Sequence, residues 1–183
     1  MTMRVTTLAK QIAQSSTEIA WPHMHANHVY DYAGTGMFNG DSMKVGEELH
    51  KHLELYLNGR FVPQREREVC SVIVEILLEL GLDDIETECA VQYGSVRGKV
   101  DLYGTHANGR SWVIEVKTTQ GSHIEEPRAQ ELMQLALYAR MLQFKNPLLA
   151  CIRVNLRTMK VGVYLTTKTA PYLDIAEQYL KSA

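Results

Sequence analysis

Cysteine is scarce in this sequence, with three residues among 183. Cys70, Cys89 and Cys151 are far apart and form no Cys-x-x-Cys pair, so we expect buried thiols and no disulfide, structural zinc or iron–sulfur cluster. Long apolar runs are also missing, because no stretch approaches the roughly 20 residues that span a bilayer. Residues 1–16 lack the apolar segment of a secretory signal. These absences predict a cytoplasmic protein that does not enter a membrane.

The composition that is present, 45% hydrophobic and 22% charged residues, is typical of a globular protein. A chain of 183 residues favours one domain with a sizeable core. The net charge of −2 conceals an uneven distribution. Residues 93–168 contain eleven Lys/Arg and five Asp/Glu (+6), whereas the remainder contains eight and sixteen (−8). Such asymmetry indicates a protein with one phosphate-facing side.

Hydrophobic periodicity predicts the elements along the chain. Apolar residues recur at helical spacing in 6–18, 42–58, 64–80, 128–144 and from about 171 onward. Strand patterns bounded by turn residues occupy 85–92, 95–104, 110–119, 148–155 and 159–166. Residues 21–41 show no period and predict an irregular connection or flap. We expect one α/β (α+β) domain over 1–183, with an N-terminal helix and flap in 1–41 and, in 42–183, a central mixed β-sheet flanked by helices.

The strands at 95–104 and 110–119 are predicted to form a hairpin, since Asn108-Gly109 between them is typical of a tight turn. Strand alternation separates two faces of the first strand. One face holds Val96, Gly98, Val100 and Leu102, and the other holds Arg97, Lys99 and Asp101. Asp101 is then expected across from Glu115, with Lys117 on the same face. Two carboxylates and a lysine suit a Mg²⁺ site, and an ordinary cross-strand salt bridge is the alternative.

Four short motifs carry a family resemblance. They are "GEELH" ending at His50, "GKVD" (Gly98 to Asp101), "EVK" (Glu115 to Lys117) and "QLALY" (Gln134 to Tyr138). In order and type they resemble the PD-(D/E)XK nuclease superfamily, and more narrowly its RecB-like exonuclease branch, which has GxxD, (D/E)xK and QxxxY motifs after a helical histidine. The resemblance covers about half of the chain. It implies a restriction-endonuclease-like PD-(D/E)XK core.

The resemblance also implies the roles of individual residues. His50, Asp101, Glu115 and the backbone carbonyl of Val116 would bind one or two Mg²⁺ or Mn²⁺ ions. Lys117 would orient or deprotonate the attacking water and offset charge on the phosphorane. Gln134 and Tyr138, four residues apart on one helix face, would steady the metal–water network or a DNA phosphate. The cysteine quartet of the iron–sulfur relatives is absent.

The function implied by the resemblance is metal-dependent hydrolysis of DNA phosphodiester bonds. Cleavage from ends, in recombination, repair or phage-type DNA processing, is the expected activity. If a phage encodes the chain, its location is the host cytoplasm. No helicase region is recognised, so unwinding would either come from a helicase, single-strand-binding or recombination partner or be unnecessary. A structure- or site-selective endonuclease, a non-catalytic DNA-binding module of the same fold and a bare α/β scaffold remain alternatives.

Further residues are weaker candidates. Arg97, Lys99, Arg128 and Arg140 are candidates for binding backbone phosphates, and Tyr30, Tyr32 and Phe38 for stacking on bases. Glu47, Glu48, Glu86 and Glu88 are near the motifs, but surface positions are favoured for them. His23, His25 and His28 resemble a metal tract, yet no cysteine or acidic partner has zinc-ligand spacing.

Overall fold

The computed structural model describes residues 2–15, 19, 21, 28–31, 42–106 and 108–182. Its strands form a mixed sheet in the order β1-β4-β5-β6-β7-β2, and β3 also pairs with β4. The strands are β1 Met3–Arg4, β2 His28–Asp31, β3 Leu82–Tyr93, β4 Val96–His106, β5 Ser111–Thr119, β6 Leu148–Asn155 and β7 Lys160–Thr166. The helices are α1 Val5–Ser15, α2 Ser42–Leu57, α3 Gln64–Glu79, α4 Ala129–Met141 and α5 Ala170–Ser182. None of these described helices is long and apolar enough to cross a membrane.

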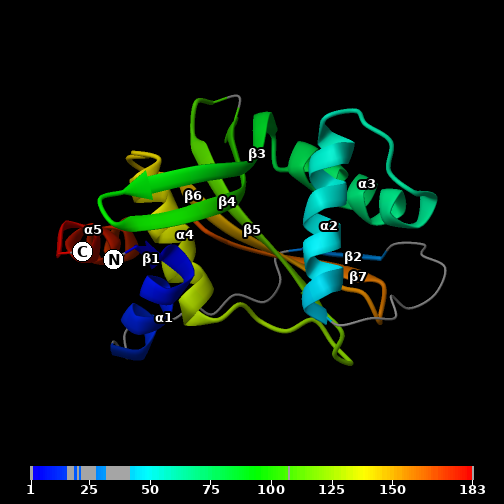
Figure 1. The fold of residues 1–183 in the computed structure, drawn as a ribbon. Helices are drawn as coiled ribbons and strands as arrows, with labels where there is room; N and C mark the ends of the chain where they lie inside the picture. Colours follow the sequence, from blue (N-terminus) through cyan, green and yellow to red (C-terminus); the bar gives the residue numbers. More distant parts are fainter. Residues whose placement is uncertain are drawn as a thin grey trace.

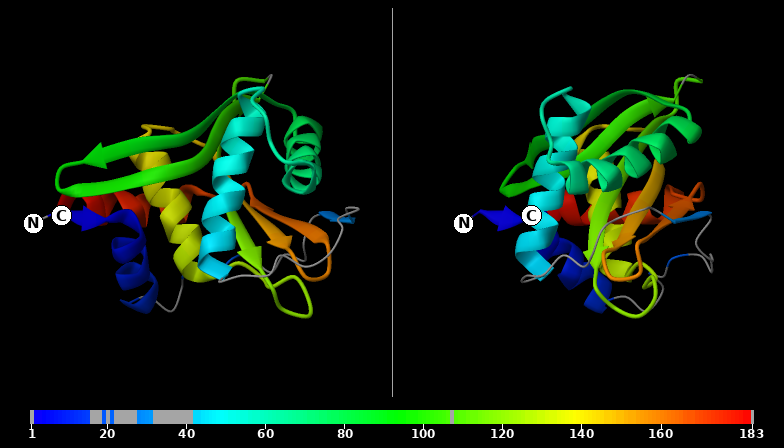
Figure 2. Two further views of the ribbon diagram at one scale, coloured as in Figure 1. Left: turned by 45° about the vertical axis from the view of Figure 1, so that its right-hand side comes forward. Right: turned by 90° about the vertical axis from the view of Figure 1, so that its right-hand side faces the viewer.

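Helices cover both faces of the sheet (Figures 1 and 2). α2 and α3 pack on one face, where Leu49 and Ile73 join Ile114 of β5 in one core cluster. α1, α4 and α5 pack on the other face, where Leu135 joins Val113 in a second cluster. β5 lies between the two clusters and is buried on both faces, which explains its nearly continuous apolar sequence. The predicted α/β class with a helix-flanked mixed sheet is confirmed.

The connectivity places α4 directly over the central strands. β3, β4 and β5 are antiparallel, whereas β5 and β6 are parallel and are joined through α4. Parallel neighbours need such a crossover, and α4 contacts both β5 and β6. The helix with the QxxxY motif therefore lies against the strand with the ExK motif.

The predicted helices and strands are confirmed, with boundaries that differ by a few residues; α4, for example, spans 129–141 rather than 128–144. Two short strands were not predicted. β1 pairs with β4, and β2 pairs with β7. The prediction that 21–41 is irregular throughout is therefore wrong at His28–Asp31. Strands of two to four residues carry too little period to be recognised, because their conformation depends on the partner strand.

Candidate active site

Strands β4 and β5 separate where the motif aspartate lies. Their antiparallel pairing ends at Leu102↔Ile114. Asp101 therefore does not pair with Glu115 across the sheet. Instead, its Oδ2 accepts a hydrogen bond of 2.9 Å from the backbone N–H of Val116. The Asp101 carboxylate lies in the opening between the two strands and lines a cleft on each side of it.

The predicted alternation along β4 is wrong beyond Val100. Val100 packs with α1 and α4, whereas Leu102 packs with α2 and α3. A regular strand would place both on one face. The break falls at Asp101, opposite Glu88 of β3, which has a left-handed φ of 53°. Asp101 consequently turns toward α2 and does not share one face with Glu115.

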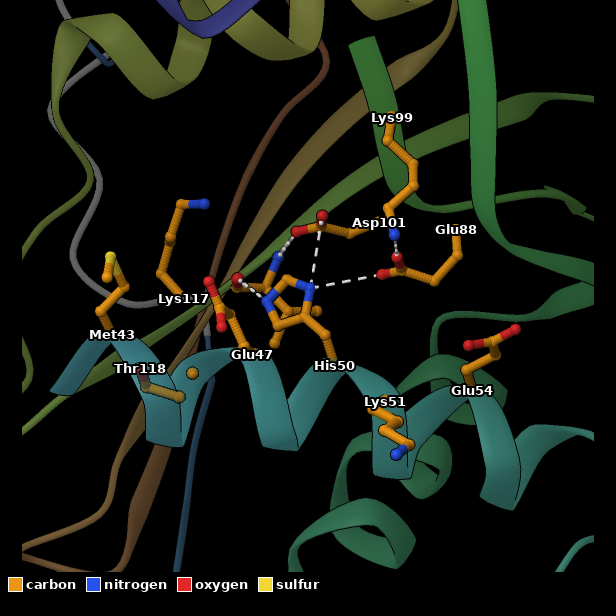
Figure 3. A pocket seen from close by; sticks show the side chains of 12 residues that line it. Met43, Glu47, His50, Lys51, Glu54, Glu88, Lys99, Asp101, Lys117 and Thr118 are labelled. Atoms are coloured by element: carbon orange, nitrogen blue, oxygen red, sulfur yellow. Dashed lines mark hydrogen bonds and ion pairs between the residues drawn. The ribbon is translucent and has the colours of Figure 1, made fainter. Parts of the chain in front are cut away.

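Three side chains with metal-binding atoms converge on the α2 side (Figure 3). His50 Nδ1 lies 3.4 Å from Asp101 Oδ1 and 3.5 Å from Glu88 Oε1. One ligand atom of each lies within 4.8 Å of the others. The second Glu88 oxygen contacts Lys99 Nζ. The expectation of a surface position for Glu88 is wrong, because its side chain is only 14% exposed and faces His50.

His50 is held at both ring nitrogens. Its Nε2 lies 2.9 Å from the carbonyl oxygen of Val116, while Nδ1 faces the two carboxylates. Burial alone would lower the pKa of His50, but hydrogen bonding to Asp101 and Glu88 raises it to about 10. The hydrogen bond with His50 in turn holds the pKa of Glu88 below its ordinary range. Protonated His50 thus supplies the positive charge that the two carboxylates require.

The remaining motif residues form a connected group on the α4 side. Glu115 is 1% exposed, and its Oε1 accepts a hydrogen bond of 2.8 Å from Gln134 Nε2 and contacts Lys117 Nζ. Gln134 Nε2 also lies 3.5 Å from the Tyr138 hydroxyl. Burial and the nearby charge of Asp101 raise the pKa of Glu115 to about 7, although Lys117 opposes the shift. The structure therefore brings β5 and α4 together as predicted.

Gly98 allows Tyr138 to approach β4. A Cβ at Gly98 would lie 2.5 Å from Tyr138 Cε1 and 2.8 Å from Val5 Cγ2. Such distances are too short for real Cβ contacts, so a larger residue would displace the ring or the helix. The glycine of GxxD and the tyrosine of QxxxY are thus in direct contact.

A buried ion pair fixes the start of α4. Arg153 of β6 lies beside Lys117 in the sheet register, and its Nη2 is 2.5 Å from Glu131 Oε2. The same Glu131 oxygen accepts a hydrogen bond of 2.8 Å from the backbone N–H of Arg128. Arg153 Nη2 also donates to the carbonyl oxygen of Glu126 at 3.3 Å. β6, the loop before α4 and the first turn of α4 are therefore joined one turn before Gln134.

Two clefts meet at the Asp101 carboxylate. The α2-side cleft has a volume of about 690 Å³ and is lined by His50, Glu88 and residues of α2 that include Glu47. The α4-side cleft has a volume of about 430 Å³ and is lined by the group around Glu115. Lys99, Asp101 and Lys117 line both clefts. Substrate bound on either side would reach the same carboxylate.

The residues present fit a hard divalent cation. Carboxylate oxygens, imidazole nitrogen and a backbone carbonyl are suitable donors. His50, Glu88 and Asp101 converge on one point, and the Val116 carbonyl lies at the other ring nitrogen of His50. Glu115 Oε2 is buried and has no hydrogen-bond partner. An unsatisfied buried carboxylate oxygen is costly, and a cation would satisfy it. Glu115 itself lies outside the converging three-residue set, on the opposite side of β5.

Other predicted residues lie in different places. Arg97 lines the α4-side cleft. Lys99 lines both clefts, but its ammonium group is paired with Glu88. Arg128 is exposed beside Glu125, and Arg140 joins α4 to α5 through Asp174 and Glu177. Neither lines the two clefts around Asp101. The side chains of His28 and Tyr30 and all of His23, His25, Tyr32 and Phe38 lie outside the described residues.

Comparison with protein-family models agrees with this architecture. The family model described as the PD-(D/E)XK nuclease superfamily matches residues 16–179. The chain is similar to the crystal structure of SSO0001 at 16% identity and a TM-score of 0.36, covering 96% of this chain and 84% of that one. It is also similar to a phage related exonuclease from Haemophilus somnus 129PT at 12% identity and a TM-score of 0.48, covering 100% and 91%. No curated protein matches the chain.

Proposed function

The chain belongs to the PD-(D/E)XK nuclease superfamily, and on this premise we propose that it is a deoxyribonuclease that requires Mg²⁺ or Mn²⁺. The observation that carries the proposal is the meeting of two groups at Asp101. His50 and Glu88 approach it from one side, and the Glu115–Lys117–Gln134 group lies on the other side. An ordinary surface salt bridge between Glu115 and Lys117 would need neither a buried glutamate nor a second acidic cluster.

The cation would be held by His50, Glu88 and Asp101, and the Val116 carbonyl and Oε2 of Glu115 are the further donors available around Asp101. When bound, it supplies Lewis-acid activation of the scissile phosphate and of a water nucleophile near neutral pH. His50 would have to give up its Nδ1 proton to ligate the cation, and its Nε2–H, which donates to the Val116 carbonyl oxygen at 2.9 Å, would keep the ring aligned.

Lys117 acts as a cation in this scheme. Burial would lower the pKa of Lys117, but the carboxylates of Glu115 and Asp101 raise it above its ordinary value. An ammonium group at neutral pH cannot accept a proton from water. Lys117 is therefore assigned to orienting the water and to offsetting the negative charge that develops on the phosphate.

Gln134 and Tyr138 position the acidic group. The Gln134 amide donates to Glu115 Oε1, which leaves Oε2 for the cation. Tyr138 packs on Gly98 and supports the Gln134 side chain. We assign cleavage from DNA ends to this site because the GxxD, ExK and QxxxY set with the helical histidine resembles the RecB-like exonucleases. A role in recombination, repair or phage-type DNA processing, with a helicase or single-strand-binding partner, belongs to the same proposal.

Purified protein should be incubated with end-labelled linear DNA and closed circular DNA in Mg²⁺, Mn²⁺ or EDTA. We expect metal-dependent release of short products from linear DNA and none from circles. Asp101→Ala and Lys117→Ala should remain folded and lose activity by about a hundredfold or more. Lys145→Ala, at an exposed lysine outside both clefts, is the matched control. Equal behaviour of wild type and both site variants on every substrate would exclude catalysis here, and cleavage of circles would indicate an endonuclease.

A further inference from the structure

The first residues of the described chain form part of the α4-side cleft. β3 pairs with β4 over most of its length, so β1 must occupy the opposite edge of β4. β5 pairs with this edge only at Leu102 to Thr105 of β4. The edge at Val96 and Arg97 is therefore available to β1. Met3 pairs with Val96, and Arg4 pairs with Arg97, in a parallel ladder. The N-terminal strand thus fills the space from which β5 has turned away, and Arg4 lines the cleft.

Arg4 and Arg97 are directly opposed in this ladder, and both are exposed. Like charges across from each other destabilise a sheet. Among the described residues, no ion pair is formed by either arginine, whereas Lys99 and Lys117 in the same cleft are matched with Glu88 and Glu115. No described carboxylate offsets the repulsion between the two guanidinium groups, and an anion bound in the cleft would offset it.

The position of the pair relative to the reacting centre identifies the anion. Both arginines line the cleft that contains Asp101, Glu115 and Lys117. Arg97 precedes Asp101 by four residues on β4, a span of about 13 Å along a strand. That distance corresponds to a few nucleotides of a DNA strand. A strand with its scissile bond at Asp101 would carry further phosphates to the arginines.

We propose that Arg4 and Arg97 form a phosphate clamp that holds the DNA strand a few nucleotides from the bond that is cut. This inference rests on the proposed nuclease function and adds a binding site to it. Guanidinium groups suit phosphate oxygens because their donors are planar and paired. The phosphate is either an internal diester or a terminal monoester, and the two sources are separable by substrate.

The test uses Arg4→Gln/Arg97→Gln and a charge-retaining Arg4→Lys/Arg97→Lys variant. Arg157→Gln, at an exposed arginine after β6 and outside both clefts, is the matched control. Binding of labelled single-stranded oligonucleotides is followed by fluorescence anisotropy in EDTA, where cleavage cannot interfere. The Gln variant should weaken binding about tenfold and lower the slope of log K against log salt by about 1.4, the value for two lost phosphate contacts. The Lys variant should keep the wild-type slope.

Steady-state cleavage with Mn²⁺ supplies a second readout. The Gln variant should raise KM about tenfold while kcat changes by less than about twofold, since the pair lies away from the reacting atoms. In the EDTA binding assay, a loss of affinity confined to 5′- or 3′-phosphorylated oligonucleotides identifies a terminal monoester, and an equal loss of affinity for single-stranded circles identifies internal diesters. Unchanged binding and salt slope in the Gln variant would overturn the clamp, even if the wild type cleaves DNA. Absence of cleavage by the wild type would instead overturn the proposed function, and the EDTA binding data would still decide the clamp.

Discussion

The backbone conformation of Glu88 shapes the α2 side of the site. Its left-handed φ of 53° interrupts β3 opposite Asp101 and turns the carboxylate toward His50. Backbone in this region is costly for a residue with a side chain. Glu88 also combines two positive partners, His50 and Lys99, with partial burial. A strained glutamate that faces a histidine and an aspartate is expected to be a metal ligand or to align one.

Glu88→Gln should therefore weaken metal binding. The Mn²⁺ concentration for half-maximal activity should rise by about 10–100-fold, as observed for groups that ligate or align ligands. Activity should recover at high Mn²⁺, because His50 and Asp101 remain. The measurement is cleavage rate against Mn²⁺ concentration.

Glu86→Gln provides the control for this experiment. Glu86 is two residues earlier on β3, is exposed, and lines neither cleft around Asp101. Its substitution changes the same charge and should leave the metal requirement unaltered. If Glu88→Gln and Glu86→Gln give the same metal titration, Glu88 has no role at the metal site.

Sequence alternation could not reveal Glu88, because it assumes regular strands. The same assumption produced the wrong face for Asp101 beyond Val100. Glu115 and Lys117, by contrast, lie on a regular strand, and their predicted common face is confirmed by the contact between them. In the structure, a β3–β4 register that pairs Thr87 with Leu102 places Glu88 opposite Asp101. That register depends on a tertiary pairing that the sequence does not specify.

At the scale of elements, the site depends on how closely α4 approaches β4. Helices and strands were predictable because each long element has its own hydrophobic pattern, as in α3, where Val69, Ile73, Ile76 and Leu77 are buried. The opening between β4 and β5 was not, because it arises from the end of a ladder rather than from a pattern. Tyr138 and Val5 pack against Gly98 of β4, and a residue larger than glycine would not leave them room. The GxxD and QxxxY motifs are therefore coupled through packing as well as through the acidic group.

Gly98→Ala tests this coupling. The new methyl group would lie 2.5 Å from Tyr138 Cε1, so the ring and α4 must shift away from β4. We expect about 1–3 kcal/mol of destabilisation from overpacking and a loss of kcat of about a hundredfold, since small displacements of positioning groups are costly. Urea unfolding and steady-state kinetics measure the two effects.

Gly121→Ala is the matched control for the substitution at Gly98. A Cβ at Gly121 would meet its nearest atom at 3.6 Å, an ordinary van der Waals contact. This variant should keep wild-type kcat and stability. Full activity in Gly98→Ala would show that the position of Tyr138 does not matter for catalysis.

At the scale of the whole molecule, protons and metal compete for one buried site. The folded chain raises the pKa of His50 from 6.5 to about 10 and that of Glu115 from 4.5 to about 7. Both groups hold protons more tightly in the folded state than in the unfolded state. The stability that they contribute is fully present below the unfolded pKa and is lost as the pH rises through the folded pKa. The lowered pKa of Glu88 contributes stability that is lost as the pH falls, and this loss begins only below about pH 4.5.

The melting temperature in EDTA should consequently fall as the pH rises from about 5 to 10. Mn²⁺ should restore stability, and the gain should grow with pH, because protons compete less with the metal. At a hundredfold excess over Kd the gain is about 2.7 kcal/mol, or about 5–10 °C for a chain of this size. His50→Gln should flatten the fall of the melting temperature between about pH 6.5 and 10 and should reduce the gain from Mn²⁺. The control is His123→Gln, at an exposed histidine outside both clefts. It should change neither the fall nor the gain. A melting temperature in EDTA that is independent of pH over this range, with no gain from Mn²⁺, would show that His50 and the carboxylates do not form a proton-blocked metal site.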